Sequence, residues 1–270
     1  MKDASWPHEL SVKKDIVHNS DLSKVYYAFT KLSNEKFGRV VALKPHLLSE
    51  TIYKLATDPK IINILKPLMG EDINIWSSAF FAKKPKSTSY VGYHQDAPFW
   101  QLSSDNVYSA WIALSESNKE NGCLEFIAHT EDYTFDLDIS NPYEAYKKGI
   151  KTSEGENLIS FNQKIPKKIK EKSPFYVELK PGEFSIHKIT VIHGSSPNKS
   201  NLPRIGLVIR YVDSKTHHLK DKNDSALNVI GKKSEYFEQE KRPYGEFTEN
   251  NLVEYNSKSN TAGTFGNKQY

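Results

Sequence analysis

The amino-acid sequence predicts a mainly β protein with flanking helices, in which a sheet sandwich or open barrel carries helices on its outside. Helical periodicity, with apolar residues three and four positions apart, is confined to residues 1–70 of the 270-residue chain. After Gly70 the pattern changes to short runs rich in β-branched and aromatic residues, which is typical of strands. Turn signals such as Asn121-Gly122 and Pro181-Gly182 separate these runs.

Three helices are expected in the first part of the chain, over residues 21–32, 45–55 and 58–69. Each has apolar residues at spacings that make one buried face. The third has the clearest start signals, with Asp58 as N-cap and Pro59 at the first helical position.

Eight strands are expected in the remainder, each bounded by glycine, proline, asparagine or serine. They are predicted over residues 73–82, 90–94, 107–114, 123–127, 175–179, 183–187, 191–195 and 204–212.

We expect residues 1–270 to form a single domain, because the sequence contains no internal repeat and no linker rich in proline, glycine and serine. Residues 1–70 are its helical N-terminal part and residues 71–215 its β-rich core. The polar, lysine-rich segment 129–174 is long and lacks a clear pattern, which favours a lid. The polar tail 256–270 is expected to fray.

The composition restricts the classes of partner. The chain is 37% hydrophobic, and its 37 basic and 33 acidic residues are interspersed, with a net charge of +4. We therefore expect no nucleic-acid partner. The lone Cys123 excludes an internal disulfide framework and a cysteine-rich zinc site. No apolar run is long enough for a membrane span and the N-terminus lacks a secretory signal, so a cytoplasmic location is expected.

A histidine and a carboxylate stand two positions apart, as His94 and Asp96, at the end of a predicted strand. Residues i and i+2 of a strand point to the same face, so both can converge on one ion. His193, in another apolar strand, is the candidate third ligand. Two imidazoles and one carboxylate form the facial triad of non-haem iron(II) oxygenases, which leaves coordination positions open. Ion pairs and helix caps are the commoner uses of a lone His-x-Asp pair.

Arg204 strengthens this interpretation, because it follows His193 and opens a predicted strand. A guanidinium at the mouth of a barrel offers a fixed fork for a carboxylate. The far carboxylate of 2-oxoglutarate would satisfy it, while the 2-oxo acid end takes two open metal positions and dioxygen (O2) the third. A structural salt bridge to a protein carboxylate is the alternative use of Arg204.

Further motifs stand at fixed offsets from these residues. They are His94-Gln95-Asp96, Trp111 to Leu114, Glu120 to Leu124, His193 to Ser200, Arg204 and Arg210-Tyr211. This set resembles the phytanoyl-CoA dioxygenase family. The resemblance implies a double-stranded β-helix (jelly-roll, cupin-like) fold for the core, with Fe(II), 2-oxoglutarate and O2 as the cofactor and cosubstrates.

The resemblance also implies roles for individual residues. His94, Asp96 and His193 match the iron ligands. Arg204 matches the residue that pairs with the C5 carboxylate of 2-oxoglutarate, and Ser195 matches one that hydrogen-bonds it.

Two more residues match the cosubstrate site, and one segment departs from the family pattern. Trp111 matches an aromatic residue that lines the cosubstrate pocket, and Lys83 matches a family lysine upstream of the metal motif, with an exposed lysine as the alternative. Where the family usually has a Pro-Gly-Ser-His run, this chain reads Ala128-His129-Thr130-Glu131. The entrance is therefore expected to be reshaped, with His129 facing either the substrate or the surface.

The segment 93–100, YHQDAPFW, narrows the resemblance to a bacterial branch of small-molecule hydroxylases, which is related to halogenases. Halogenases replace the metal carboxylate with a small residue, so Asp96 favours hydroxylation. Tyr93, Phe99 and Trp100 are candidate walls of the substrate pocket, with ordinary core packing as the alternative. His187 is expected either to face the cavity or to be a core histidine.

The expected function is hydroxylation of a C–H bond of a small metabolite. An anionic or zwitterionic substrate, such as an aminoalkylphosphonate or an amino acid, would suit the nearby basic residues. A non-enzymatic β-sandwich binding protein, a halogenase and a metal hydrolase with the same ligands are the alternatives. The sequence carries no signal for the identity of the substrate or for the oligomeric state.

Overall fold

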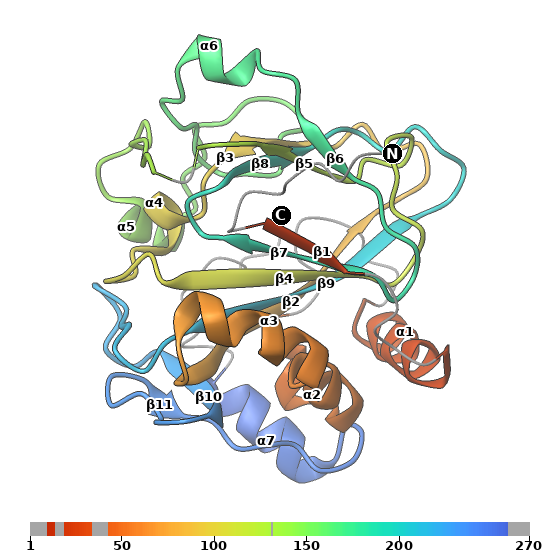
Figure 1. The fold of residues 1–270 in the computed structure, drawn as a ribbon, viewed down its shortest axis with the longest axis vertical. Helices are drawn as coiled ribbons and strands as arrows, with labels where there is room; N and C mark the ends of the chain where they lie inside the picture. The colour runs from red at the N-terminus through yellow and green to blue at the C-terminus, as the bar shows by residue number, and fades with distance from the viewer. Residues whose placement is uncertain (1–9, 14–18, 34–42, 131, 259–270) are drawn as a thin grey trace.

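The computed structural model describes residues 10–13, 19–33, 43–130 and 132–258, which fold around two facing β-sheets (Figure 1). The strands are β1 Leu10–Lys13, β2 Ile73–Lys83, β3 Val91–His94, β4 Val107–Ala113, β5 Leu124–Ile127, β6 Phe175–Val177, β7 Phe184–Lys188, β8 Ile192–Ser195, β9 Arg204–Val212, β10 Ser225–Ile230 and β11 Glu238–Gln239. The larger sheet has the order β1-β7-β4-β9-β2-β10-β11, and the smaller has the order β3-β8-β5-β6. These neighbours pair in antiparallel fashion, except that β10 and β11 are parallel.

Helices cover the outer face of the larger sheet, and the smaller sheet covers its other face (Figure 1). The helical layer contains α1 Asn19–Ser33, the 3-10 turn η1 Pro45–Leu47, α2 Glu50–Ala56, α3 Pro59–Met69 and α7 Glu249–Lys258. The short helices α4 Ala97–Trp100, α5 Pro142–Lys147 and α6 Lys167–Lys170 interrupt loops. No helix in the described part of the chain combines the length and apolar character needed to cross a membrane.

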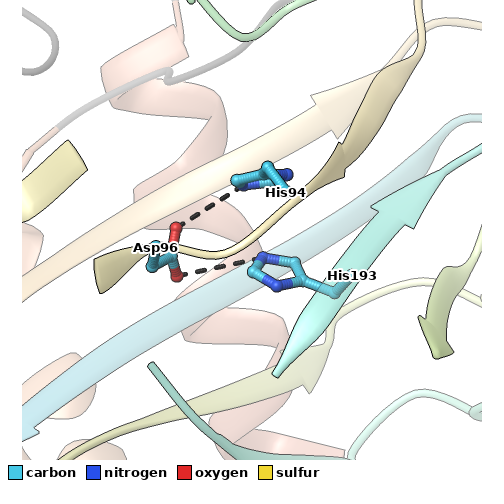
Figure 2. A group of neighbouring side chains, drawn as sticks. All are labelled: His94, Asp96 and His193. Carbon is cyan, nitrogen blue, oxygen red and sulfur yellow. Dashed lines mark ion pairs between the residues drawn. The ribbon is translucent and has the colours of Figure 1, made fainter. Parts of the chain in front are cut away.

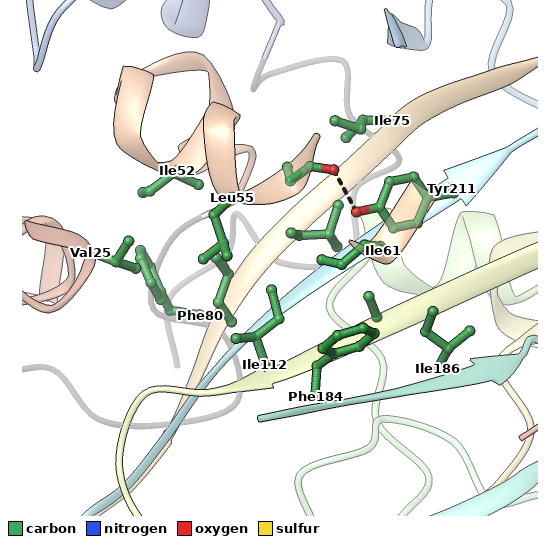
Figure 3. Packing of buried hydrophobic residues seen from close by; sticks show 14 of the residues in the cluster. Val25, Ile52, Leu55, Ile61, Ile75, Phe80, Ile112, Phe184, Ile186 and Tyr211 are labelled. Carbon is green, nitrogen blue, oxygen red and sulfur yellow. Dashed lines mark hydrogen bonds between the residues drawn. The ribbon is translucent and has the colours of Figure 1, made fainter. Parts of the chain in front are cut away.

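The alternation of side chains along β9 divides them between the helical layer and the space between the sheets. The odd-numbered residues 205–211 belong to the main hydrophobic cluster, which joins the sheet to the helices (Figure 3). Within it, the hydroxyl of Tyr211 donates a hydrogen bond to the carbonyl oxygen of Ala56 in α2 at 2.7 Å. Arg204 and Arg210 point the other way and line the space between the sheets. Packing of the helices therefore determines which face of β9 forms the site.

A buried polar network joins segments far apart in the sequence to the larger sheet. The ammonium of Lys44 donates to the carboxylate of Glu240 and, at 2.7 Å, to the carbonyl oxygen of Ser225. The other carboxylate oxygen of Glu240 lies 3.0 Å from Nε2 of His46, whose Nδ1 lies 2.7 Å from the hydroxyl of Ser78. The charged side chains are fully buried. Each finds a partner, as buried charges require.

The prediction of one continuous helix over residues 45–55 is wrong, because η1 ends at Leu47 and a separate helix, α2, begins at Glu50. Ser49 interrupts it with an extended backbone, φ −133° and ψ 122°. Its hydroxyl accepts a hydrogen bond from the amide of Ile52 at 3.1 Å, which makes Ser49 the N-cap of a separate helix. The third predicted helix is confirmed from its Asp58 cap to its end before Gly70.

The sheet continues beyond the expected β-rich core. Strands β10 and β11 follow residue 215, and β1 precedes residue 71. Helix α7 extends to Lys258, through the first residues of the predicted polar tail 256–270, and the rest of that tail lies outside the described residues.

Part of the segment 129–174 packs into the protein. Phe161 and Ile165 are buried, and Leu158 and Ile159 reach the cavity between the sheets. His129 is exposed, with a positive φ of 58°. It therefore adopts a left-handed backbone conformation at the turn where the family motif carries a glycine.

Candidate metal centre

Two paired strands bring the three candidate metal ligands together. His94 ends β3 and His193 lies in β8, and the two are directly opposite in the antiparallel register. Asp96 follows β3 at the start of α4 and turns back toward both rings (Figure 2). Its carboxylate oxygens lie 3.5 Å from Nε2 of His94 and 3.8 Å from Nε2 of His193. One potential ligand atom from each residue lies within 4.8 Å of the others, which is close enough to hold one metal ion.

The backbone orients both imidazoles for coordination. Nδ1 of His94 lies 2.9 Å from the carbonyl oxygen of Gly92, and Nδ1 of His193 lies 3.0 Å from that of Val191. A carbonyl oxygen can only accept, so each Nδ1 carries the proton. The lone pair of each Nε2 therefore faces the other two ligands, as in metal sites whose outer contacts fix the tautomer.

The protonation states also suit a metal site. Burial lowers the pKa of His193 to about 4, so its ring is neutral near pH 7. Burial alone would raise the pKa of Asp96, but His193 and His94 outweigh that effect and hold it well below its usual range. Neutral imidazoles and an ionised carboxylate are the forms that bind a cation.

The cluster opens into a cavity of about 130 Å³ between the two sheets. Of the other residues predicted for the site, Trp100, Trp111, His187, Ser195 and Arg204 line this cavity.

Three predicted residues do not line the cavity. Tyr93 is turned toward Glu125 and donates its hydroxyl to the carboxylate at 2.7 Å. Phe99 is buried in a hydrophobic cluster, where its ring stacks on that of Phe161 at 6.3 Å. Lys83 is also outside the lining. Tyr93 and Phe99 therefore support the walls of the cavity from behind.

Arg204 is a buried cation at one end of the cavity. Its side chain lies over the ring of Trp111 at 5.4 Å, and its residue is only 3% exposed. Its Nε has no hydrogen-bond partner, and no carboxylate among the described residues forms an ion pair with it. Burial lowers its pKa to about 10, which leaves it charged. A buried guanidinium in this setting is suited to an incoming anion.

Lys83 lies behind the lining of this end of the cavity and contacts residues of β8. It stands opposite Arg204 in the β2–β9 register. Its side-chain nitrogen Nζ donates to the hydroxyl of Ser195 at 2.7 Å, to the carbonyl oxygen of Ser195 at 3.1 Å and to that of Ser196. Burial lowers the pKa of Lys83 to about 6, and the charge of Arg204 adds to that effect. Lys83 thus anchors the end of β8, on which Ser195 faces the cavity.

The interpretation of the sequence assigned no role to several polar residues that the fold brings to the cavity. Arg210, Ser77 and Ser109 line it, and Gln95 binds the neighbouring loops. The sequence contained a signal for Arg210. An even number of positions separates it from Arg204 on one strand, so both side chains point to the same face. Ser77 and Ser109 could be placed beside Arg210 only from the pairing of β2, β9 and β4.

A double-stranded β-helix with two histidines and a carboxylate between its sheets defines a class of metal-binding jelly-roll proteins. The family model described as "Phytanoyl-CoA dioxygenase (PhyH)" matches residues 21–206, and the chain belongs to this family. The resemblance based on the sequence motifs is therefore confirmed.

Two curated relatives and one solved structure illustrate the relationship. The phytanoyl-CoA dioxygenase domain-containing protein 1 homolog of Caenorhabditis elegans is 28% identical, over 66% of this chain and 60% of its own. The probable alpha-ketoglutarate-dependent hypophosphite dioxygenase of Stutzerimonas stutzeri is 27% identical, over 68% of this chain and 61% of its own. The chain thus spans about three fifths of the length of these relatives. The apo non-heme monooxygenase ThoJ matches with a TM-score of 0.74 and 19% identity, over 94% of this chain and 92% of its own, which confirms the jelly-roll fold.

Proposed function

We propose that this chain is an iron(II)- and 2-oxoglutarate-dependent dioxygenase that hydroxylates a C–H bond of a small metabolite, with residues 1–270 acting as one oxygenase domain. One observation carries the proposal: the His94, Asp96 and His193 cluster opens into the same cavity as the buried Arg204. The cluster suits a divalent metal, and the arginine suits the far carboxylate of a dicarboxylic cosubstrate.

The residues present fit the cofactor and cosubstrate. Two imidazoles and one carboxylate are the donor set that favours non-haem iron(II) and leaves coordination positions for other ligands. When bound together, iron(II), 2-oxoglutarate and O2 supply an oxidant able to attack an unactivated C–H bond.

The chain itself contributes binding, orientation and exclusion of water. Arg204 and the Ser195 hydroxyl would hold the C5 carboxylate of 2-oxoglutarate, with Trp111 against the guanidinium. The lining is largely apolar at Trp100, Leu158 and Ile159, which keeps bulk water from the reacting atoms.

Each alternative function leaves one feature of this site unexplained. A halogenase lacks the metal carboxylate, whereas Asp96 faces both histidines here. A binding module has no need of two histidines whose Nε2 atoms both face one carboxylate. A hydrolase has no need of a buried arginine placed for a dicarboxylate. The substrate class, a small anionic or zwitterionic metabolite, is supported by one relative whose name refers to hypophosphite, a small oxyanion.

The test is an anaerobic titration of the protein with Fe(II) and 2-oxoglutarate, followed by a succinate-release screen in air over amino acids, phosphonates, small amines and acyl thioesters. We expect the visible charge-transfer band of an iron–2-oxo acid chelate in the wild type. The Asp96→Ala variant should show no such band, and Glu238→Ala, which removes an exposed carboxylate, should match the wild type. A wild type that neither forms the chelate nor releases succinate would exclude the oxygenase.

A further inference from the structure

Four polar side chains form one row across the cavity face of the larger sheet. The strand register places Ser77 of β2 opposite Arg210 of β9, Arg210 opposite Ser109 of β4, and Ser109 opposite His187 of β7. All four residues line the cavity. The binding of iron and 2-oxoglutarate proposed above uses none of them.

Arg210 is the charged member of this row. Its guanidinium lies 4.8 Å from the ring centre of Trp100 and 5.8 Å from that of Phe81, and it donates to the hydroxyl of Ser77 at 3.4 Å. Stacking on aromatic faces orients a guanidinium without using its in-plane N–H groups. Those groups bind a carboxylate or phosphonate in the bidentate manner that lysine cannot reproduce.

The row is separate from the end of the cavity assigned to 2-oxoglutarate. Arg204 and Arg210 lie on the same face of β9, and six residues of strand correspond to about 20 Å. A 2-oxoglutarate molecule held between the metal and Arg204 would therefore extend away from Arg210.

The row also lies next to the metal ligands. The ring centres of His187 and His193 are 5.0 Å apart. A molecule whose acidic group contacts Arg210 would therefore hold its nearest carbon atoms beside the metal position. Trp76 and Trp100, with ring centres 5.3 Å apart, form an apolar wall at this end of the cavity.

We infer that Ser77, Arg210, Ser109 and His187 form the subsite that binds the acidic group of the substrate. The ligand class is a compact oxyanion, a carboxylate or phosphonate on a short carbon chain. Arg210 pairs with the charge, and the two hydroxyls and the imidazole complete the hydrogen bonding. Calling this ligand the substrate rests on the proposed function, whereas the anion site itself does not require iron.

The test measures equilibrium binding of ethylphosphonate and of propionate by calorimetry, with propionamide as the uncharged counterpart of propionate. Both the metal-free protein and the anaerobic protein loaded with Fe(II) and 2-oxoglutarate are titrated. We expect the wild type to bind at least one of the acids, and to bind propionamide far more weakly. Arg210→Gln should weaken acid binding about tenfold or more, the effect of losing a charge-assisted hydrogen bond. It should leave the affinity for 2-oxoglutarate unchanged.

Two further variants serve as controls. Arg242→Gln removes an exposed arginine that also stacks on aromatic rings, 4.9 Å from Tyr53, and should bind the acids like the wild type. Ser109→Ala changes the row without removing a charge and should give a smaller loss. It keeps the test decisive if Arg210→Gln folds poorly.

Three outcomes would overturn the inference: no binding of either acid by the wild type, equal binding by Arg210→Gln, or a loss of 2-oxoglutarate affinity in Arg210→Gln that matches any loss of acid binding. Failure of the proposed function would appear differently. In that case the wild type would form no iron–2-oxoglutarate chelate, while the metal-free protein would still bind the acids through Arg210.

Discussion

The backbone amide of Gln95 donates a hydrogen bond to the side-chain oxygen of Gln163 at 2.7 Å, although the two residues are 68 positions apart. The side-chain amide of Gln95 donates to the carbonyl oxygen of Thr190 at 2.5 Å, and its oxygen accepts from the amide of Phe135 at 3.0 Å. Gln95 is also the residue between two candidate metal ligands. It therefore couples the position of those ligands to the segment 129–174.

Replacing Gln95 with alanine should loosen that segment. Buried backbone groups would lose their partners, which costs about 1–3 kcal/mol of unfolding free energy. We expect faster amide hydrogen exchange over residues 130–163 and weaker iron binding. The matched control is Gln239→Ala, because Gln239 also donates to two backbone carbonyl oxygens, those of Ser234 and Phe237, but these lie outside the segment 129–174. If exchange in the segment is unchanged in Gln95→Ala, Gln95 does not hold it in place.

Replacing His193 with alanine should abolish iron binding while the protein stays folded. We expect a loss of metal affinity greater than the 10–100-fold that removal of an outer-shell contact typically causes. Calorimetric titration with Fe(II) under anaerobic conditions measures it, and circular dichroism checks the fold. His129→Ala, which removes an exposed histidine, is the control and should bind iron like the wild type. Equal iron affinity in the two variants would remove His193 from the metal site.

Replacing Gly206 with alanine should damage the cosubstrate end of the cavity without deleting any binding group. A Cβ atom at position 206 would lie 2.1 Å from a ring atom of Trp111, so the ring must move. Trp111 stacks with Arg204, and a misplacement of about 1 Å can cost roughly 100-fold in rate. We expect a raised KM for 2-oxoglutarate in a succinate-release assay, with iron affinity unchanged.

The variant Arg204→Ala should act in the same direction and more strongly, because it removes the charge itself. Gly70→Ala is a control for backbone strain, since φ at Gly70 is 98° and no atom lies within 4 Å of an added Cβ. It should lower stability and leave the KM for 2-oxoglutarate as in the wild type. A wild-type KM in both Gly206→Ala and Arg204→Ala would place the 2-oxoglutarate elsewhere.

The buried carboxylate of Glu240 should make the protein sensitive to acid. Burial on its own raises the pKa of Glu240, but Lys44 and His46 outweigh it and hold the value at about 2, below the usual 4.5. The unfolded chain then binds the proton more readily than the folded one. The stabilisation is fully present above about pH 4.5 and is lost as the pH falls toward 2.

Chemical denaturation between pH 2 and pH 7 measures this effect. Glu240→Gln should lower the unfolding free energy near neutral pH by about 3–5 kcal/mol, because it leaves a buried cation unpaired. It should also flatten the loss of stability at acid pH. Glu238→Gln breaks an exposed ion pair with Lys258 and should change the unfolding free energy by less than about 1 kcal/mol. The assignment fails if the wild type and Glu240→Gln lose stability in parallel below pH 4.5.

Local signals predicted much of the fold. Asp58 and Gly70 mark the two ends of α3, and the β-rich run predicted over residues 204–212 has the bounds of β9. The capping hydroxyl of Ser49 was also visible in the sequence, but a continuous apolar face across residues 45–55 concealed it. Strand β10 could not be anticipated in this way, because its identity depends on pairing with β2, far away in the chain.

The residues of the candidate site also differ in whether local sequence patterns or long-range strand pairing determine their positions. His94 and Asp96 could be paired from their spacing of two positions, although Asp96 lies beyond the end of β3 with a helical backbone rather than on the same strand. His193 and Arg204 could be added from motifs at fixed offsets. The row from Ser77 to His187 depends on the register of four strands, and β2 has a β-bulge between Ile75 and Ser77 that no local pattern reveals. Sequence reasoning therefore singled out the candidate metal ligands, Arg204 and His187, and gave no role to Ser77, Ser109 and Arg210, which the structure places on the same cavity.

The Lys44–Glu240 pair has a practical consequence for anyone who wishes to trim this protein. Its members lie on either side of the region 71–215 that would be chosen as a minimal barrel. Cutting at those limits would remove both charges, the strand β10 and most of the helices that shield the sheet. Such a fragment would expose a broad hydrophobic face of the larger sheet to water and should aggregate. Useful truncations must therefore begin before residue 44 and end after residue 240.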